Sequence, residues 1–317
     1  MARLAGRKCI LMMADKLRNR NSIVYLCEIY IGCDDGKVRK MNPDTGEVVW
    51  TSSDFGDTVN GLAVDPSGYV YAGAYDGKVR KINPSTGSTV WTSASFGTGG
   101  YPHISCDGSG NVYIGTADGL VRKLNPSNGG VLWTGADLGE NVQGIGCDSS
   151  GNLYAGAYDG YYRKLSPSDG SVVWTSEDTG DYGPAVCCDR FGNVFVTTST
   201  TIKKLNPSTG ATIWTTSSYG SGLADAYCDH YGYIYTINNS GYVKKANANG
   251  GLVWSTSDLG GGFWGVSCDR AGYVYVGGND GVLKKLNPTT KAEIWSSSAI
   301  GSWIRTVRTN YNPGWGA

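Results

Sequence analysis

The sequence predicts an all-β fold, a β-propeller of seven four-stranded antiparallel blades, and three observations predict it. A tryptophan recurs every 40 to 42 residues, and each copy ends the same phrase. Between successive tryptophans lie four short apolar segments bounded by Gly, Asn, Asp or Pro, which is typical of strands and turns. Four strands repeated with a period of about 40 residues are typical of a propeller blade. The recurring tryptophans are Trp50, Trp91, Trp133, Trp174, Trp214, Trp254 and Trp295.

The second copy shows the unit clearly as GLAVD, PSG, YVYAG, AYDG, KVRKIN, PSTG and STVWTS, over residues 61–93. The turn Asp76-Gly77 predicts a tight hairpin, because Gly and Asp tolerate the positive φ angles that such turns require. In residues 83–87 the proline sets φ for a type I turn and Gly87 takes the left-handed position that closes it. Lys291 occupies that glycine position in the seventh copy, so we expect backbone strain there.

The two ends of the chain complete each other. The first copy offers only three strands, at residues 28–33, 37–42 and 48–51. The missing strand is present at the C-terminus, where residues 303–310 follow Gly301 as residues 59–65 follow Gly56. We therefore expect this segment to become the innermost strand of the first blade and to close the ring, which removes exposed sheet edges. Residues 28–317 are then one propeller domain, and residues 1–27 are a basic tail outside the repeat.

These repeats resemble the PQQ-type β-propeller repeat family, whose motif is roughly Ala-x-Asp-x-x-Thr-Gly-x-x-x-Trp. In the second copy Thr86, Gly87 and Trp91 match, while Asn83 replaces the aspartate and Lys81 the alanine. The resemblance covers residues 28–317 and implies that each tryptophan docks across a blade interface. It says little about activity, because the family includes quinone-dependent dehydrogenases, outer-membrane assembly lipoproteins and scaffolds. We expect a non-enzymatic member.

Composition narrows the classes of partner. Lys+Arg and Asp+Glu both total 27, so the net charge is zero, which disfavours nucleic acid and anionic membranes as partners. No apolar run reaches the roughly 18 residues of a membrane span. The apolar stretch at residues 9–14 is too short for a signal peptide and is followed by charged residues. We expect an intracellular or virion location. The six basic residues among the first twenty favour a tail that is flexible or docked on a partner over a nucleic-acid arm.

An enzyme finds little support in the residues, and we expect no catalytic residue, metal or cofactor. The resemblance to quinone dehydrogenases would imply a vicinal disulfide, for which Cys187-Cys188 is the one match. Cys188 has a simpler explanation, because Cys occupies the same repeat position in five copies and Val64 occupies it in the second, as in a small buried apolar slot. Aspartates that follow this slot begin DxxG turns and are expected to cap them. The cysteines of the slot are Cys106, Cys147, Cys188, Cys228 and Cys268.

The candidate binding surface is the face that carries the second turns and the blade-to-blade loops. The opposite face carries regular DxSG and NPSTG turns, whereas the copies diverge after each recurring Phe-Gly or Leu-Gly. We expect these segments to ring the centre of the propeller and to bind a protein or larger assembly, such as a phage virion, with a lectin-like carbohydrate or receptor binder as the alternative. Drift without selection would also explain the divergence. The candidate residues are Asn60, Tyr101, His103, Gln143, Tyr182, Asp225, Phe263, Trp264, Trp303 and Arg305.

A basic doublet, Arg80-Lys81 in the second copy, recurs in all seven. Adjacent strand residues point to opposite faces, so each doublet sends one side chain toward each blade interface. We expect the stems to pack on aromatic rings and the charged heads to form inter-blade ion pairs with Asp65 and its equivalents. The alternative is an anion-binding site.

Overall fold

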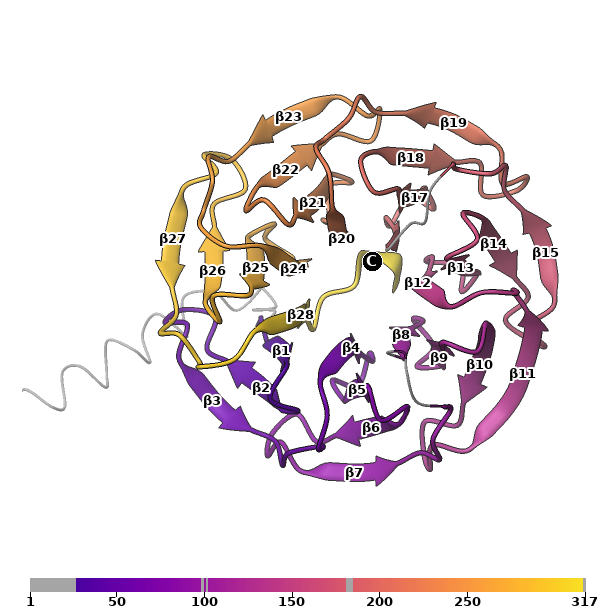
Figure 1. Cartoon of the computed structure of the whole chain (residues 1–317), viewed down its shortest axis with the longest axis horizontal. Coiled ribbons are helices and arrows are strands. Elements are labelled where there is room, and N and C mark those ends of the chain that lie inside the picture. The colour runs from indigo at the N-terminus through magenta and orange to yellow at the C-terminus, as the bar shows by residue number, and fades with distance from the viewer. Residues whose placement is uncertain (1–26, 98–99, 101, 181–184, 316–317) are drawn as a thin grey trace, which may run out of the picture.

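The computed structural model describes residues 27–97, 100, 102–180 and 185–315, and within these residues the strands form seven four-stranded antiparallel sheets arranged as a ring (Figure 1). Blade 1 consists of β28 (Ile304–Thr309), β1 (Ile29–Cys33), β2 (Val38–Met41) and β3 (Val48–Thr51), in that order from the centre outward. In each of the other blades the strands follow the order of the sequence, with the first strand innermost and the fourth outermost.

The strands of blades 2 to 4 are β4 (Val59–Val64), β5 (Val70–Ala74), β6 (Val79–Ile82), β7 (Thr89–Thr92); β8 (His103–Cys106), β9 (Val112–Gly115), β10 (Leu120–Leu124), β11 (Val131–Asp137); and β12 (Val142–Cys147), β13 (Leu153–Ala157), β14 (Tyr162–Leu165), β15 (Val172–Thr175). Those of blades 5 to 7 are β16 (Val186–Cys188), β17 (Val194–Thr197), β18 (Ile202–Leu205), β19 (Thr212–Thr215); β20 (Leu223–Cys228), β21 (Ile234–Asn238), β22 (Val243–Ala246), β23 (Leu252–Ser255); and β24 (Phe263–Cys268), β25 (Val274–Gly278), β26 (Leu283–Leu286), β27 (Glu293–Ser296). A short 3-10 helix, η1 (Pro313–Trp315), follows β28.

The ring closes as the sequence predicts. Strand β28 pairs antiparallel with β1, with Ile31 opposite Val307, so the two ends of the chain share blade 1. The regular strand is slightly shorter than the segment 303–310 assigned from the sequence. The chain then continues from β28 toward the middle of the ring (Figure 1).

The core lies between neighbouring blades. In the described part of the chain, buried apolar side chains form seven clusters, and each cluster takes residues from two adjacent blades. At the first interface, for example, Tyr30 and Val38 of blade 1 pack with Val64 and Val70 of blade 2. Each face of a blade packs against a neighbouring blade. The two inner strands of each blade are therefore apolar on both faces, and apolar and polar residues do not alternate along them.

The tryptophans dock across these interfaces, as the family resemblance implies. The Trp50 indole N–H donates to the carbonyl of Pro84 in the next blade, at 2.9 Å, and Trp50 also packs on Tyr30 of its own blade. Its ring lies so close to Gly87 that a Cβ there would come within 2.6 Å of a ring atom. The glycine of the turn is thus required both by its positive φ of 73° and by the tryptophan. The same indole-to-carbonyl bond is made by Trp91, Trp133, Trp174, Trp254 and Trp295.

Lys291 carries the strain expected of it. Its φ is 57°, and among the described residues it is the only one other than glycine with a positive φ. Its ammonium group donates to the carbonyl of Ser255 in the preceding blade at 2.8 Å, a contact that a glycine could not make.

The prediction of inter-blade ion pairs for the basic doublet is wrong. Arg80 pairs with Asp76 of its own hairpin, Nη2 to Oδ2 at 2.6 Å, and its guanidinium also lies over the Phe55 ring. In blades 1, 3 and 4 the arginine of the doublet makes the same pair with the aspartate four residues earlier. The reason is the hairpin itself, since the turn between the second and third strands brings the aspartate beside the arginine.

The second residue of the doublet does cross the interface, but it finds a carbonyl rather than a carboxylate. Lys81 donates to the carbonyl of Pro126 in the next blade at 2.9 Å and lies over the Tyr69 ring. Asp65 is unavailable because its Oδ1 accepts from the backbone of its own DxSG turn and its Oδ2 accepts from the Tyr71 hydroxyl. The recurring aspartates therefore cap their turns, as expected, and the doublet is part of the scaffold.

Candidate functional site

A hollow of about 300 Å³ lies at the centre of the ring, where the innermost strands begin. Second turns contribute Tyr158, Ser199 and Asn239 to its lining, so it opens on the face that carries the variable loops. We call it the mouth. Six of the ten residues predicted to bind a partner line the mouth: Asn60, His103, Gln143, Asp225, Trp264 and Arg305.

The other four predicted binding residues do not line the mouth, or lie outside the described residues. Tyr101 and Tyr182 are in the latter group. Trp303 is 43% exposed beside the mouth. Phe263 is a correction, because it is fully buried between blades 6 and 7. It holds the first position of its inner strand, where Val59 and Val142 are also buried, so strand alternation turns its ring into the core.

Arg305 organises one side of the mouth. Its Nε and Nη2 donate to both carboxylate oxygens of Asp34, at 2.5 and 3.1 Å. Its guanidinium carbon lies 5.1 Å from the centre of the Trp264 ring and 4.8 Å from that of Trp303. The indole N–H of Trp264 is buried and has no acceptor among the described residues. A bidentate ion pair and two aromatic rings hold Arg305 in place.

Arg308 and Asp225 form a second charged pair deeper in the ring. Nη1 of Arg308, on β28, lies 2.9 Å from Oδ2 of Asp225, on β20, and also donates to the carbonyl of Val266 on the intervening β24. Asp225 accepts in turn from the Val266 N–H at 3.2 Å. Burial alone would lower the pKa of Arg308, but the Asp225 carboxylate outweighs it and the pKa is raised. The Arg308 guanidinium therefore stays charged, and its contacts tie blades 1, 6 and 7 together.

His103 faces the same charges from β8. Burial lowers its pKa from 6.5 to about 4, and the positive charge of Arg308 acts in the same direction. The imidazole is therefore neutral at pH 7, with one nitrogen able to donate and the other to accept. It offers the mouth a polar group without a charge.

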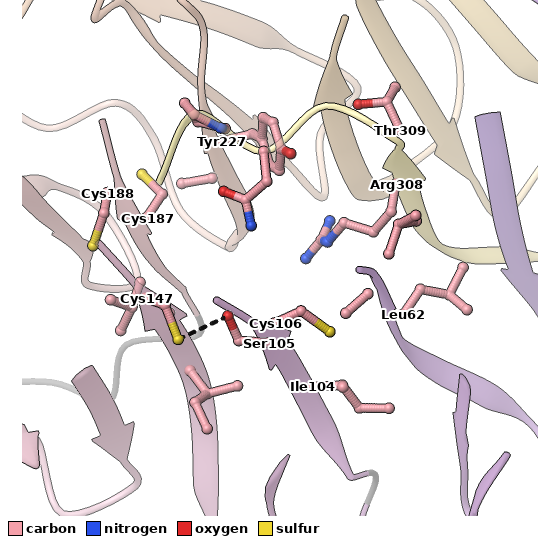
Figure 2. A pocket seen from close by; sticks show the side chains of 18 residues that line it. Leu62, Ile104, Ser105, Cys106, Cys147, Cys187, Cys188, Tyr227, Arg308 and Thr309 are labelled. Atoms are coloured by element: carbon pink, nitrogen blue, oxygen red, sulfur yellow. Dashed lines mark hydrogen bonds between the residues drawn. The ribbon is translucent and has the colours of Figure 1, made fainter. Parts of the chain in front are cut away.

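A second hollow, of about 70 Å³, lies deeper along the axis (Figure 2). Leu62, Ile104 and Arg308 line both hollows, so the two meet at that level. Figure 2 shows the Arg308 guanidinium pointing into the space between the innermost strands. At its far end the segment after β28 crosses the axis, where Pro313 lines the hollow and the Tyr227 hydroxyl donates to the carbonyl of Tyr311.

Arg308, Tyr227 and Asp34 were missed from the sequence, although comparison of the copies contains the signal for the first two. Arg308 and Tyr227 each lie two residues before the Asp or Asn that caps the following turn. Small residues hold that position in the other copies: Ala63, Ser105, Gly146, Cys187 and Ser267. The replacement of these small residues by a large polar residue in two copies is the signal in the sequence.

The cysteine slot is buried in all five copies, as expected of a small apolar position. Cys187 and Cys188 are both free thiols, and they face different interfaces: Cys187 packs toward blade 6 and Cys188 toward blade 4. Among the described residues, no group of three His, Cys, Asp or Glu side chains could hold a metal ion.

The turns on the opposite face are not all regular. In blades 5 and 6 the DxSG turn becomes DRFG and DHYG, and Phe191 and Tyr231 at these turns are 60% and 64% exposed. Arg190 and His230 are linked across the two turns at 3.2 Å. This aromatic patch is a second surface that a partner could contact, and it provides a matched control for the mouth.

Comparison with known proteins agrees with this architecture. The model of one family, described as outer membrane protein assembly factor BamB, matches residues 34–177 and 75–226, which together make up more than half of the chain. The chain belongs to this family. The PQQ-type repeat inferred from the sequence is thereby confirmed for this BamB-like propeller.

A search of the curated proteins found no match. Among solved structures, the crystal structure of a computationally designed protein, Ika8, is similar with a TM-score of 0.68 and 18% identity, over 90% of this chain and 91% of that one. This likeness concerns the fold alone. No helix in the described part of the BamB-like chain is long and apolar enough to cross a membrane.

Proposed function

We propose that the protein is a non-catalytic interaction module that binds a protein or a larger assembly through the mouth. One observation carries the proposal: residues that break the repeat, from the inner strands of five blades and from the closing strand β28, come together around one hollow. A scaffold that only has to close needs no individual residues there. The description of the matched family as an assembly factor supports a protein partner.

The chemistry of the mouth suits such a partner. Trp303 offers an exposed aromatic anchor, and Arg305 beside it is fixed by Asp34 and so loses little side-chain entropy on binding. In one form of the proposal the partner is a capsid or tail protein and the propeller is part of a virion. Copurification with assembled particles supports that form, and its absence from purified particles contradicts it.

A photo-cross-linking amino acid placed at one position tests the binding surface. Introduced at Trp303 in cells that contain the natural partner, it should give a discrete cross-linked adduct. Introduced at Tyr231, which is 64% exposed on the opposite face, it should give none. An adduct from Tyr231 with none from Trp303 would show that the partner uses the other face.

A lectin-like function is the second candidate, and the position of Trp264 in the lining of the mouth favours it. An aromatic ring with the amides of Asn60 and Gln143 nearby is a suitable lining for a sugar, and the hollow has room for one. Glycan-array binding that is lost on Trp264→Ala would establish this function. A quinone-like absorbance in the purified protein would contradict the non-catalytic proposal.

A further inference from the structure

The inner strands of neighbouring blades meet in a repeated diagonal contact. The innermost strand of each blade ends just before a turn-capping Asp or Asn. The side chain two positions before this capping residue in one blade contacts the side chain one position before the capping residue in the next blade. Ser105 Oγ lies 3.6 Å from Cys147 Sγ at the interface of blades 3 and 4, as the dashed line in Figure 2 shows. Ser267 Oγ lies 3.2 Å from Thr309 Oγ1 at the interface of blades 7 and 1. The same contact therefore recurs at different blade interfaces.

At the interface of blades 5 and 6 the same contact joins two thiols. Cys228 Sγ lies 3.2 Å from Cys187 Sγ, and both side chains belong to one buried cluster. The two cysteines hold non-equivalent positions of their blades: Cys187 lies two residues before the capping Asp189, and Cys228 lies one residue before the capping Asp229.

We propose that Cys187 and Cys228 form an oxidisable pair that a peroxide converts into an inter-blade disulfide. A disulfide requires an S–S distance of about 2.0 Å, so the sulfur atoms must approach by only about 1 Å. The pair is the one diagonal contact at which the sequence places a thiol on both sides. The slot cysteines of the other blades face Ala63, Ser105, Gly146 or Tyr227 by the same geometry.

Cys187 is the thiol that an oxidant reaches first. It lines the inner hollow, whereas Cys228 is fully buried behind it. A peroxide is close to water in size and fits a hollow of about 70 Å³, which is too small for a peptide disulfide such as oxidised glutathione. Burial raises the pKa of the Cys228 thiol well above its ordinary value, so we expect Cys187 to react in the first step and Cys228 in the second.

The chemistry balances with one peroxide. The Cys187 thiolate attacks a peroxide oxygen and the O–O bond breaks, which gives a sulfenic acid and a hydroxide that takes up a proton to become water. The Cys228 sulfur then attacks the Cys187 sulfur, the S–O bond breaks, and a second water leaves with the Cys228 proton. Two thiols lose two electrons, and the peroxide is reduced to two waters.

The experiment uses the folded full-length chain. The reduced protein is exposed to hydrogen peroxide, unfolded in an alkylating reagent and mapped by mass spectrometry without reduction. We expect a cross-linked pair of peptides that contain Cys187 and Cys228, with a mass lower by roughly 2 Da than the sum of the free peptides. The variant Cys188→Val, which carries the residue of the same slot in blade 2, removes the neighbouring cysteine in the chain and should keep the cross-link.

Two further variants locate the bond. Cys187→Ser reproduces the Ser105–Cys147 pair and Cys228→Val reproduces the residue of blade 2, so neither introduces a group foreign to the position. Each should abolish the cross-link, whereas the control Cys147→Val should leave it unchanged. The proposal is overturned if peroxide leaves Cys187 and Cys228 both free to alkylation, oxidises them separately without joining them, or joins Cys187 to Cys188.

Discussion

Arg308 on β28 and Asp225 on β20 pair across the ring at 2.9 Å, and of the ion pairs between described residues theirs is the only one that joins strands of different blades. The other pairs lie within single blades and their loops. Apolar clusters and tryptophan and lysine bonds to carbonyls recur between the blades, whereas the ion pair across the ring is an individual feature of the closing strand.

Removing one member of the pair should destabilise the fold. Arg308→Ser leaves the Asp225 carboxylate largely buried without its partner, and we expect a loss of about 2 kcal/mol in the free energy of unfolding. Asp225→Gly should cost a similar amount. The double variant uses residues that other blades already hold at these positions, and it should be more stable than the sum of the single losses predicts. Urea denaturation of the four proteins measures the coupling, and strictly additive losses would show that the pair contributes nothing.

His103 should make stability depend on pH. Its pKa is about 4 in the folded chain against an ordinary value of 6.5, so between these values the unfolded chain binds a proton that the folded chain does not. The free energy of unfolding should therefore fall as the pH drops from 6.5 to 4, by about 2 kcal/mol from this residue. His103→Gln should remove that part of the pH dependence. Equal slopes for the two proteins in this window would contradict the burial of a neutral imidazole.

The NPSTG turn of blade 2 should not tolerate a residue other than glycine at its last position, whereas blade 7 already carries Lys291 there. Gly87→Ala places a Cβ within 2.6 Å of the Trp50 ring at a φ of 73°, so we expect a loss of at least 2 kcal/mol. Lys291→Gly relieves a left-handed backbone and should stabilise the protein by about 0.5 kcal/mol, after the loss of the bond to Ser255 and the greater freedom of glycine when unfolded. Thermal denaturation compares the two, and a loss on Lys291→Gly larger than that on Gly87→Ala would be inconsistent with this explanation.

Most of the fold could be predicted from the sequence because its signals are local and repeated. The spacing of Trp50 and its equivalents gave the number of blades, and the lone strand at 303–310 gave the closure. The partner of Arg80 could not be deduced, because Asp65 and Asp76 are both within reach along the chain and only the three-dimensional turn shows that Asp65 is already occupied. Repetition reveals that a position matters without revealing what it contacts.

The mouth could be predicted in part for the same reason. Divergence between copies identified Asn60, Gln143 and Arg305, but it gave no direction for a side chain, and Phe263 was therefore assigned to the surface although it points into the core. Asp34 was missed because it lies in a turn of blade 1 that meets the closing strand only in the folded ring. Contacts that join the two ends of the chain have no local signature.

The central claim, that a partner binds the mouth rather than the opposite face, is tested most directly by measuring the affinity of the isolated partner for matched surface variants. Trp303→Ala truncates the exposed aromatic residue beside the mouth, and Tyr231→Ala truncates an exposed aromatic residue on the opposite face. We expect Trp303→Ala to weaken binding by at least tenfold, about 1.4 kcal/mol, and Tyr231→Ala to leave it within twofold. Unchanged affinity for Trp303→Ala together with a tenfold loss for Tyr231→Ala would contradict the account.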